Sequence, residues 1–293
     1  MTNNNNGFAG VPPQADADQS IGAIIKQANN LSPEQIEQVV LYQREKGVKF
    51  GEAAVALGLA KREDILWALS QQFHYPYAAD GRKKLSSELI AANSPFSEQA
   101  EAFRDIRSQL ILSVFGPDQT RKALAVVSPN AGDGKSFFAA NMGVNFSQLG
   151  GRTLLVDADM RTPKLHEIFG IESSSGLSGI LSGRSETNVI RPVEDLPSLY
   201  LLPVGVVPPN PLELVQRPAF GHLIRELLTK FDYVIVDTPA LQHGSDAKVI
   251  AGACGAALTL GRQGTTQMSA MNGVVQQLAR ANTKLAGVVM NQY

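Results

Sequence analysis

The sequence has little cysteine, no long apolar run and almost no net charge, and each lack excludes a class of protein. The single cysteine, Cys254, rules out an internal disulfide framework and any site built from several cysteines. It lies in the apolar run Val249–Leu260, which predicts a packed thiol. Without a run of about 18 apolar residues or a signal-peptide pattern, no membrane span or secretion is expected. The net charge of −1 argues against nucleic-acid binding. We therefore expect a cytoplasmic protein that reaches a membrane through a partner.

The composition is that of a globular protein, and the chain is long enough for more than one domain. It has 293 residues, of which 44% are hydrophobic. Residues 1–19 contain four consecutive asparagines and hardly an apolar side chain, which predicts a disordered tail. Residues 20–79 contain an internal repeat, and residues 80–97 hold the Asp-Gly and Ser-Pro pairs typical of a linker. Residues 98–293 form the predicted larger domain.

The repeat appears when Ser20–Gln43 is aligned with Lys49–Gln72. The alignment pairs Gly22 with Gly51, Glu34 with Glu63, Ile36 with Ile65, Val40 with Leu69 and Gln43 with Gln72. The segment Ser32-Pro33-Glu34-Gln35 combines a capping serine, a first-turn proline and an acidic first turn, so it predicts a helix that starts near Ile36. Each copy predicts two short amphipathic helices, and two stacked copies would bury one small core.

The stretch Ala123–Asn141 reads as a strand, a glycine-rich turn and a helix that begins at Lys135. The glycines let successive N–H groups turn toward a phosphate, and the helix N-terminus adds partial positive charge. In such a loop Lys135 reaches the β- and γ-phosphates, and Ser136 ligates Mg²⁺. Pro129 stands where the usual pattern has glycine, and an ordinary glycine turn is the alternative interpretation. The predicted nucleotide-binding residues of this loop are Asn130, Ala131, Gly132, Asp133, Gly134, Lys135, Ser136 and Phe137.

Two further apolar runs end in aspartate. Thr153–Val156 is followed by Asp157 and Asp159, and Tyr233–Val236 is followed by Asp237. The carboxyl ends of parallel strands meet at one edge of a sheet, where ligands bind. Because Mg²⁺ takes one or two carboxylates beside phosphates and waters, the three aspartates predict a Mg²⁺–nucleotide site. The alternative for each aspartate is a helix N-cap.

A helix is predicted over about Glu98–Phe115, directly before the first strand of the larger domain. Glu101, Arg104 and Arg107 recur every three residues, so they share one face of this helix. A solvated, salt-bridged face is one interpretation, and a functional face beside the nucleotide site is the other.

Together these motifs resemble those of the bacterial tyrosine kinases of exopolysaccharide synthesis. SPNAGDGKS, LLVDADMR and YVIVDTP resemble the family's Walker A, Walker A′ and Walker B motifs, and NPLEL, SDA and GVVMN resemble three further segments. The resemblance covers about residues 95–293. It implies an α/β fold with a doubly wound, mostly parallel P-loop NTPase sheet, here preceded by a small all-helical repeat domain. A repeat domain ahead of a kinase is similar to the EpsG-type chain-length-determinant kinases.

The resemblance implies roles for the catalytic and metal-binding residues. Lys135 contacts the phosphates of ATP, and Ser136 binds Mg²⁺. Asp157 and Asp159 supply a second acidic site, in which one of them assists deprotonation of the acceptor hydroxyl. Asp237 holds Mg²⁺ through water. The implied metal set is Ser136, Asp157 and Asp237.

Further residues correspond to the family's base-binding and assembly positions. Asn291 would read the adenine edge, and Arg262 aligns with a basic residue of the family whose role we do not assign. Glu101, Arg104 and Arg107 match the oligomerisation motif through which neighbouring subunits form a ring. The resemblance thus implies a ring-shaped homo-oligomer.

The sequence departs from related patterns at two places. The MinD/ParA ATPases carry a signature lysine where this chain has Asn130, which disfavours that class. The family's kinases end in a flexible tail with a tyrosine cluster, whereas Tyr293 lies two residues after Asn291, a span of about 7 Å. We therefore expect the acceptor tyrosines on a partner, or an ATP-driven assembly switch.

The N-terminal repeat resembles the MshE-type N-terminal domain of type II secretion and pilus ATPases. Some members of that family bind cyclic di-GMP through the leading arginine of the motif. Ser20 and Lys49 stand at those two positions here, so the planar fork of arginine is missing. Cyclic di-GMP binding and a plain docking role both stay open.

The expected function is an ATP- and Mg²⁺-dependent protein-tyrosine kinase that regulates exopolysaccharide chain length or export. The resemblance implies a separate membrane chain-length-determinant protein (a polysaccharide co-polymerase) that recruits the kinase to the inner membrane. The alternative is a nucleotide-gated ATPase scaffold without significant kinase activity, whose N-terminal domain senses cyclic di-GMP. The sequence identifies neither the polysaccharide, nor the acceptor tyrosine, nor the oligomer size.

Overall fold

The computed structural model describes residues 21–61, 64–65, 68, 86–117, 119–184, 187–194 and 196–292. The chain divides into two compact units, Met1–Ala79 and Asp80–Tyr293. The predicted disordered tail, the second half of the second repeat copy and Tyr293 fall largely or wholly outside the described residues. None of the helices in the described part of the chain is long and apolar enough to cross a membrane.

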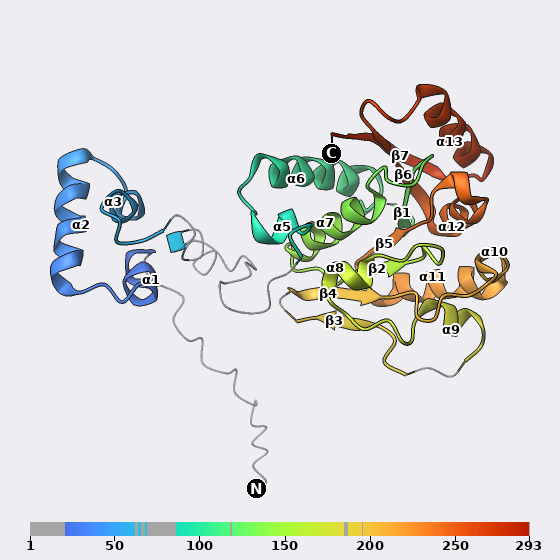
Figure 1. The fold of residues 1–293 in the computed structure, drawn as a ribbon, viewed down its shortest axis with the longest axis horizontal. Helices are drawn as coiled ribbons and strands as arrows, with labels where there is room; N and C mark the ends of the chain where they lie inside the picture. Colours follow the sequence, from blue (N-terminus) through green and yellow to red (C-terminus); the bar gives the residue numbers. More distant parts are fainter. Residues whose placement is uncertain are drawn as a thin grey trace, which may run out of the picture. The chain divides into compact units, whose positions relative to one another are not determined.

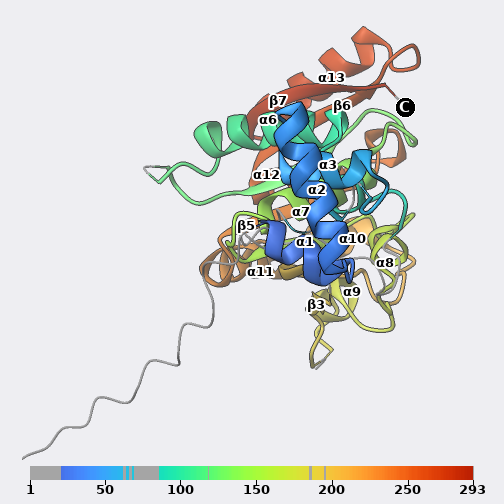
Figure 2. The same ribbon diagram turned by 90° about the vertical axis from the view of Figure 1, so that its left-hand side faces the viewer.

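The first unit contains three described helices, α1 (Ile21–Ala28), α2 (Pro33–Lys46) and α3 (Phe50–Ala56), which lie together in both views (Figures 1 and 2). Ser32 caps α2, because its hydroxyl accepts the Gln35 N–H at 3.3 Å and its N–H donates to Gln35 Oε1 at 2.9 Å. The helix therefore begins at Pro33, three residues before the predicted start. Gly47 ends it in the left-handed conformation, with φ of 65°.

The core of the first unit follows the repeat. In the described part of this unit, the buried residues of the hydrophobic core form four pairs. The two members of each pair are 29 residues apart in the chain, which is also the offset that pairs Gly22 with Gly51. In every pair the first copy supplies a large side chain and the second copy an alanine. The pairs are Ile24 with Ala53, Ile25 with Ala54, Leu31 with Ala60, and Val39 with Ala68. The two copies thus build one core from complementary halves.

The second unit is built on one seven-stranded sheet with the strand order β3-β4-β2-β5-β1-β6-β7 (Figure 1). All neighbouring strands pair in parallel except β3 and β4, which are antiparallel at one edge. The strands are β1 (Ala123–Val127), β2 (Thr153–Asp157), β3 (Arg191–Val193), β4 (Leu196–Leu202), β5 (Tyr233–Asp237), β6 (Gly255–Arg262) and β7 (Lys284–Asn291). The predicted strand at residues 123–127 is confirmed, and the two aspartate-tipped strands each extend one residue further than predicted.

Helices cover both faces of this sheet, as the doubly wound prediction requires. The fully buried strands alternate their side chains between the two layers: Leu124 and Val126 point to one, and Ala125 and Val127 to the other. One layer contains α5 (Ile90–Asn93), α6 (Glu98–Ser113), α7 (Lys135–Ser147) and α8 (Leu165–Phe169). The other contains α9 (Leu177–Leu181), α10 (Pro211–Val215), α11 (Pro218–Lys230), the 3₁₀ turn Leu241–His243, α12 (Asp246–Cys254) and α13 (Met268–Arg280).

The structure differs from the linker expected over residues 80–97. Within this segment, Leu89, Ala91 and Ala92 are buried in the core of the second unit, and α5 packs on α7. The Ala91 N–H donates to Asn141 Oδ1 at 2.9 Å, and Asn141 Nδ2 donates to the Glu88 carbonyl at 2.8 Å. The turn-forming residues that suggested a linker lie on either side of this short apolar helix.

The apolar run that holds Cys254 is divided between two elements. It fills the end of α12 and most of β6, with Gly255 in the left-handed conformation between them. Cys254 is buried, and burial raises the pKa of its thiol well above the ordinary value. The prediction of a packed thiol is therefore confirmed.

Candidate functional site

The loop between β1 and α7 has the backbone shape of an anion-binding cradle. Gly132 and Gly134 have φ of 81° and 95°, a region that favours glycine. A Cβ at Gly134 would also collide with the side-chain amide of Asn291. Since α7 begins directly after Gly134, its unpaired N–H groups and the positive end of its dipole face the loop.

Lys135 lies buried within this loop. Its side chain is 6% exposed, and its ammonium donates to Ser128 Oγ at 3.1 Å. Ser128 in turn donates to the Asn130 carbonyl at 2.8 Å, so the lysine is held against its own loop. Ser128 was not among the predicted site residues, although its position between strand and loop was a signal that could have identified it.

Ser136 and Asp237 meet beside the cradle. Ser136 Oγ donates to Asp237 Oδ2 at 2.5 Å, across from α7 to the end of β5. Burial raises the pKa of Asp237 to about 7, while the Ser136 bond and the Lys135 charge oppose that rise. The carboxyl group of Asp237 therefore changes its charge near neutral pH.

Asp157 lies opposite Asp237 in the register of β2 and β5, but its carboxylate is bonded locally. Asp157 Oδ2 accepts the Lys164 and Leu165 N–H groups at 3.2 and 3.1 Å, and its Oδ1 accepts the Asp159 N–H at 3.2 Å. It thereby accepts the first N–H groups of α8 from outside the helix, whose N-cap residue is Lys164. Burial raises the pKa of Asp157 well above its usual range, and the Asp237 charge raises it further.

Asp159 also bonds within its own turn. Its Oδ1 accepts the Arg161 and Thr162 N–H groups at 3.1 and 2.9 Å, and its Oδ2 accepts the Thr162 hydroxyl at 3.0 Å. The side chain is nearly buried, and its charge is close enough to raise the pKa values of both other aspartates. The three carboxylates thus form one electrostatic group although two of them have local hydrogen-bond partners.

The residues present fit Mg²⁺ with a small set of protein ligands. In the described part of the chain, no three His, Cys, Asp or Glu side chains converge as a metal cluster. Mg²⁺ needs fewer, because substrate phosphates and waters complete its octahedron. Ser136 and Asp237 place a hydroxyl and a carboxylate together beside the cradle, which suits that set. The metal role predicted for Asp157 stays a prediction.

Asp133 connects the phosphate loop to the end of the sheet formed by β6 and β7. Its side chain is 1% exposed; its Oδ2 accepts the Asn130 N–H at 2.9 Å and its Oδ1 the Thr266 hydroxyl at 2.8 Å. Its backbone carbonyl accepts Asn291 Nδ2 at 3.2 Å. Thr266 was missed by the sequence reasoning, because it belongs to no motif and is 133 residues away in the chain.

An apolar groove of about 480 Å³ lies beside this connection, between α6, α7 and the ends of β6 and β7. Phe103, Phe137 and Asn291 are among its lining residues, and the two phenylalanine rings are 6.1 Å apart between centroids. Asn291 is therefore placed both at the groove and on the phosphate loop. Arg262 does not line the groove; its N–H donates to Thr266 Oγ1 at 2.7 Å, and its residue is exposed.

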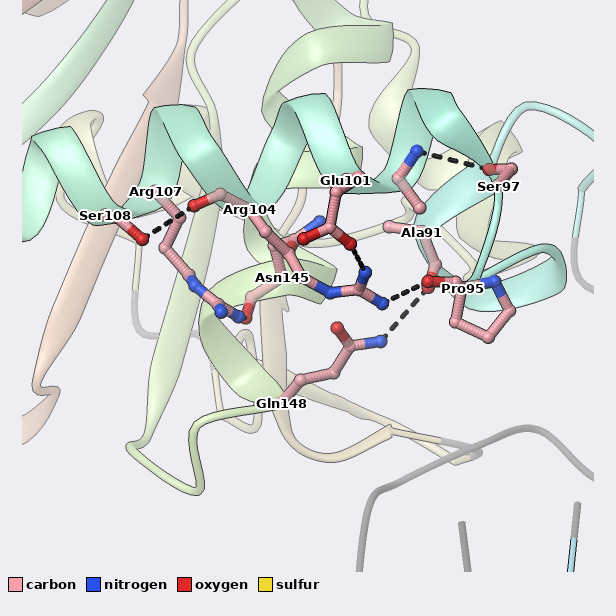
Figure 3. A network of polar contacts seen from close by, with 10 residues as sticks. Ala91, Pro95, Ser97, Glu101, Arg104, Arg107, Ser108, Asn145 and Gln148 are labelled. Atoms are coloured by element: carbon pink, nitrogen blue, oxygen red, sulfur yellow. Dashed lines mark hydrogen bonds and ion pairs between the residues drawn. The ribbon is translucent and has the colours of Figure 1, made fainter. Parts of the chain in front are cut away.

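The three residues of the predicted assembly face bond within the chain (Figure 3). Arg104 donates to the Glu101 carboxylate and to the Pro95 carbonyl at the start of α6. Arg107 Nη1 donates to the Asn145 carbonyl on α7 at 2.7 Å. The Arg104 side chain is 19% exposed, so this face is less solvated than a simple salt-bridged surface. The oligomerisation role stays a prediction.

An ion pair between a partly exposed arginine and a buried aspartate holds the loop that follows β2. Arg161 Nη2 donates to both carboxylate oxygens of Asp246, at 3.1 and 3.0 Å, and Asp246 is 2% exposed at the start of α12. The pair ties the loop that carries Asp159 to the helix that follows β5. The sequence placed both residues in motifs but did not predict that they meet.

Comparison with known proteins places this site in a family. Residues 124–293 match the model of the CobQ/CobB/MinD/ParA nucleotide binding domain. The chain is 31% identical to CapB of Staphylococcus aureus over 214 residues, which cover 72% of this chain and 92% of that protein. It is also 31% identical over 208 residues to the tyrosine-protein kinase YwqD of Bacillus subtilis, covering 71% of this chain and 87% of YwqD. The same identity holds over 205 residues of the tyrosine-protein kinase Wzc of Salmonella typhimurium, but these span only 28% of Wzc.

Solved structures agree with these relatives. The chimerical protein CapA2B2 matches with a TM-score of 0.66 and 32% identity, over 77% of this chain and 97% of that one. The kinase domain of the Escherichia coli tyrosine kinase ETK matches with a TM-score of 0.67 and 27% identity, over 72% of this chain and 82% of that one. The phosphate loop, the paired strand-end aspartates and the sheet order all lie within the matched part. This chain therefore belongs to the bacterial tyrosine-protein kinases, built on the nucleotide-binding fold of the MinD/ParA group.

Proposed function

We propose that this kinase transfers the γ-phosphoryl group of Mg²⁺–ATP to tyrosine side chains and thereby regulates exopolysaccharide chain length or export. The observation that carries the proposal is the contact of Ser136 with Asp237, next to the buried Lys135 and the glycine-rich loop. A hydroxyl, a carboxylate and an ammonium at the carboxyl edge of parallel strands supply what a Mg²⁺–triphosphate needs.

Positioning and charge neutralisation supply most of the catalysis in phosphoryl transfer. The N–H groups of residues 131–136 and the Lys135 ammonium would hold the phosphates and offset their negative charge. Ser136 and Asp237 would hold Mg²⁺, which when bound neutralises charge on the β- and γ-phosphates. The adenine base would occupy the groove beside Phe137 and Asn291.

The phenolic proton of the acceptor tyrosine needs a base near the γ-phosphate. We propose that Asp157 or Asp159 receives this proton on a carboxylate oxygen. Both aspartates lie buried at the end of β2 beside the phosphate loop, and either acts as the base only in its ionised form. The Arg161–Asp246 pair would keep the loop that carries both aspartates in place during the transfer.

The experiment is to measure phosphate transfer from γ-labelled ATP to a synthetic copolymer of glutamate and tyrosine. Label on tyrosine that exceeds free phosphate release supports a kinase, whereas phosphate release without transfer indicates an ATPase scaffold. Lys135→Met should abolish nucleotide binding and transfer. Lys230→Met is the matched control, because Lys230 is exposed on α11 and pairs with Glu226.

The N-terminal unit and the membrane partner belong to the same proposal. We propose that a chain-length-determinant protein activates the kinase. We also propose that the repeat unit docks the chain to a protein complex in the membrane. The resemblance of the motifs to those of the bacterial tyrosine kinases of exopolysaccharide synthesis, whose membrane part is a separate chain-length-determinant protein, supports this proposal. Recruitment of the full chain to vesicles that contain such a partner, compared with empty vesicles, would test it.

A further inference from the structure

We propose that Thr266 is a positioning residue that holds the Asp133 carboxylate outside the phosphate cradle and so sets the affinity for the triphosphate of the nucleotide. The inference rests on the proposed binding of ATP at this loop. It gives a role to the turn after β6, which belongs to none of the sequence motifs.

The role that we assign to Thr266 is electrostatic, because the Asp133 carboxylate and the phosphates carry charge of the same sign. Asp133 lies between Gly132 and Gly134, in the loop whose N–H groups would surround the phosphates. A carboxylate free to turn into that loop would repel a triphosphate and compete for the same N–H donors. In the structure the carboxylate is buried, and each of its oxygens accepts one hydrogen bond, from Asn130 N–H and from Thr266.

The direction of the Thr266 bond is fixed by its second partner. The Arg262 N–H donates to Thr266 Oγ1 at 2.7 Å, so the hydroxyl accepts from the backbone and its one hydrogen goes to Asp133 Oδ1. Two backbone bonds, from the N–H groups of Thr265 and Thr266 to the Arg262 carbonyl, hold the turn in place. The chain of bonds from Arg262 through Thr266 to Asp133 is therefore polarised in one direction and strengthens the final bond.

The same aspartate is held from a second strand. Asn291, at the end of β7, donates to the Asp133 carbonyl, and the Asn291 carbonyl accepts the Gln263 N–H at 2.8 Å. Asp133 is thus anchored by its side chain to the turn after β6 and by its backbone to β7. We assign the Thr266 contact to carboxylate placement and the Asn291 contact to loop placement.

The test uses calorimetry on the full chain with Mg²⁺ and two ligands, a non-hydrolysable ATP analogue and inorganic triphosphate. Thr266→Val keeps the shape and removes the hydroxyl, and we expect both ligands to bind about tenfold more weakly, equivalent to about 1.4 kcal/mol. Thr266→Ser keeps the hydroxyl and should bind as the wild type does. Thr265→Val is the matched control, because Thr265 is the exposed neighbour in the same turn.

The two ligands distinguish the phosphate role from a role at the base. A loss confined to the ATP analogue, with inorganic triphosphate unaffected, would overturn the proposal. So would weak binding by Thr266→Ser. If the unfolding temperature shows that Thr266→Val does not fold, Thr266→Ala replaces it in the same comparison. Failure of the wild type to bind the ATP analogue would contradict the proposed function itself, and it is recognised before any variant is compared.

A double-mutant cycle tests whether Thr266 acts through Asp133. In an Asp133→Ala background there is no carboxylate to place, so adding Thr266→Val should change the affinity for inorganic triphosphate less than twofold. A full tenfold loss in that background would show that Thr266 acts by another route, and the proposal would be wrong.

Discussion

Asp157 and Asp237 are two buried carboxyl groups on neighbouring strands, and the pKa of each is raised above its ordinary value. Burial is the main cause for each, and the charges of neighbouring aspartates add to it. A carboxyl group with a raised pKa binds its proton more tightly in the folded chain than in the unfolded chain. Its contribution to stability is therefore complete below the unfolded pKa and is lost as the pH rises through the folded pKa.

We predict that the nucleotide-free, Mg²⁺-free chain becomes less stable as the pH rises from about 5 to 8. For Asp237 the window runs from its ordinary pKa of 3.8 to about 7, and between pH 5 and 7 the loss should be about 2 kcal/mol. Urea unfolding of the wild type and of Asp237→Asn at several pH values measures it. The slope should be shallower for the variant, and equal slopes would contradict the assignment.

At this scale the sequence predicted the residues whose neighbours are close in the chain. Lys135, Ser136 and Asp237 follow from local patterns, since a strand, a glycine turn and a helix start fix where each residue lies. The contact of Asp133 with Thr266 could not be predicted, because it depends on how β6 ends beside the phosphate loop. The local bonds of Asp157 could not be predicted either, because they depend on where α8 begins.

Among the elements, the short helix α5 and the residues just before it are hydrogen-bonded to the longer helix α7. Asn141 on α7 is fully buried, and its side-chain amide bonds three backbone groups: the Ala91 N–H and the carbonyls of Glu88 and Phe137. Gln148 adds a bond from the end of α7 to the Ala91 carbonyl at 3.1 Å. The helix that begins at the phosphate loop is thus bonded, at its middle and at its end, to the segment around α5 in the same unit.

We predict that Asn141→Ala lowers the free energy of unfolding by about 2–3 kcal/mol, because the buried Ala91 N–H of α5 and the Glu88 carbonyl before it lose this partner. Urea unfolding of the full chain measures this. Asn93→Ala is the control: its amide also bonds a backbone carbonyl, that of Ser86, but it is exposed, so its cost should stay below about 1 kcal/mol. Equal costs for the two variants would mean that α5 adds nothing through Asn141.

The assembly face on α6 needs a similar comparison. Arg104 and Arg107 both donate to backbone carbonyls of their own chain, so the pair Arg104→Ala with Arg107→Ala should lower stability by about 1–3 kcal/mol as well as oligomer mass. Light scattering and urea unfolding of the same samples separate the two effects. Lys230→Ala is the control, because it lies outside this face and its exposed ion pair with Glu226 is worth less than about 1 kcal/mol. An unchanged mass in the double variant would leave the arginines with an intrachain role.

Strands and long helices were more predictable than α5 for a physical reason. Buried parallel strands are continuous apolar runs with turn residues at both ends, and a helix of several turns shows its periodicity. The described helix of α5 is four residues long, too short to show a period, and it lies among turn-forming residues. Its packing on α7 decides its conformation, and packing is not visible in composition.

At the scale of the whole molecule, the chain joins a helical unit to a kinase unit. If the helical unit binds cyclic di-GMP and is not only a docking unit, we predict that the affinity of the natural chain is weak, because Ser20 and Lys49 lack the forked charge of arginine. The double change Ser20→Arg with Lys49→Arg should raise the affinity at least tenfold, as hydrogen bonds to charged groups are each worth roughly 1.5–3 kcal/mol. Calorimetry on the full chain measures both. Submicromolar binding by the natural chain would contradict the prediction, and no binding by the variant would leave a docking unit.

In the core of the helical unit, large side chains of one repeat copy correspond to alanines of the other, and this limits how the repeat can be extended. At four equivalent positions of this core, the first copy has a large side chain and the second copy an alanine. Two copies of the first kind would overfill the core, and two of the second kind would leave it hollow. The copies are therefore not interchangeable modules that can be added in series. They are two halves of a closed pair, and any gene rearrangement that reorders or multiplies one half would have to change the other half with it.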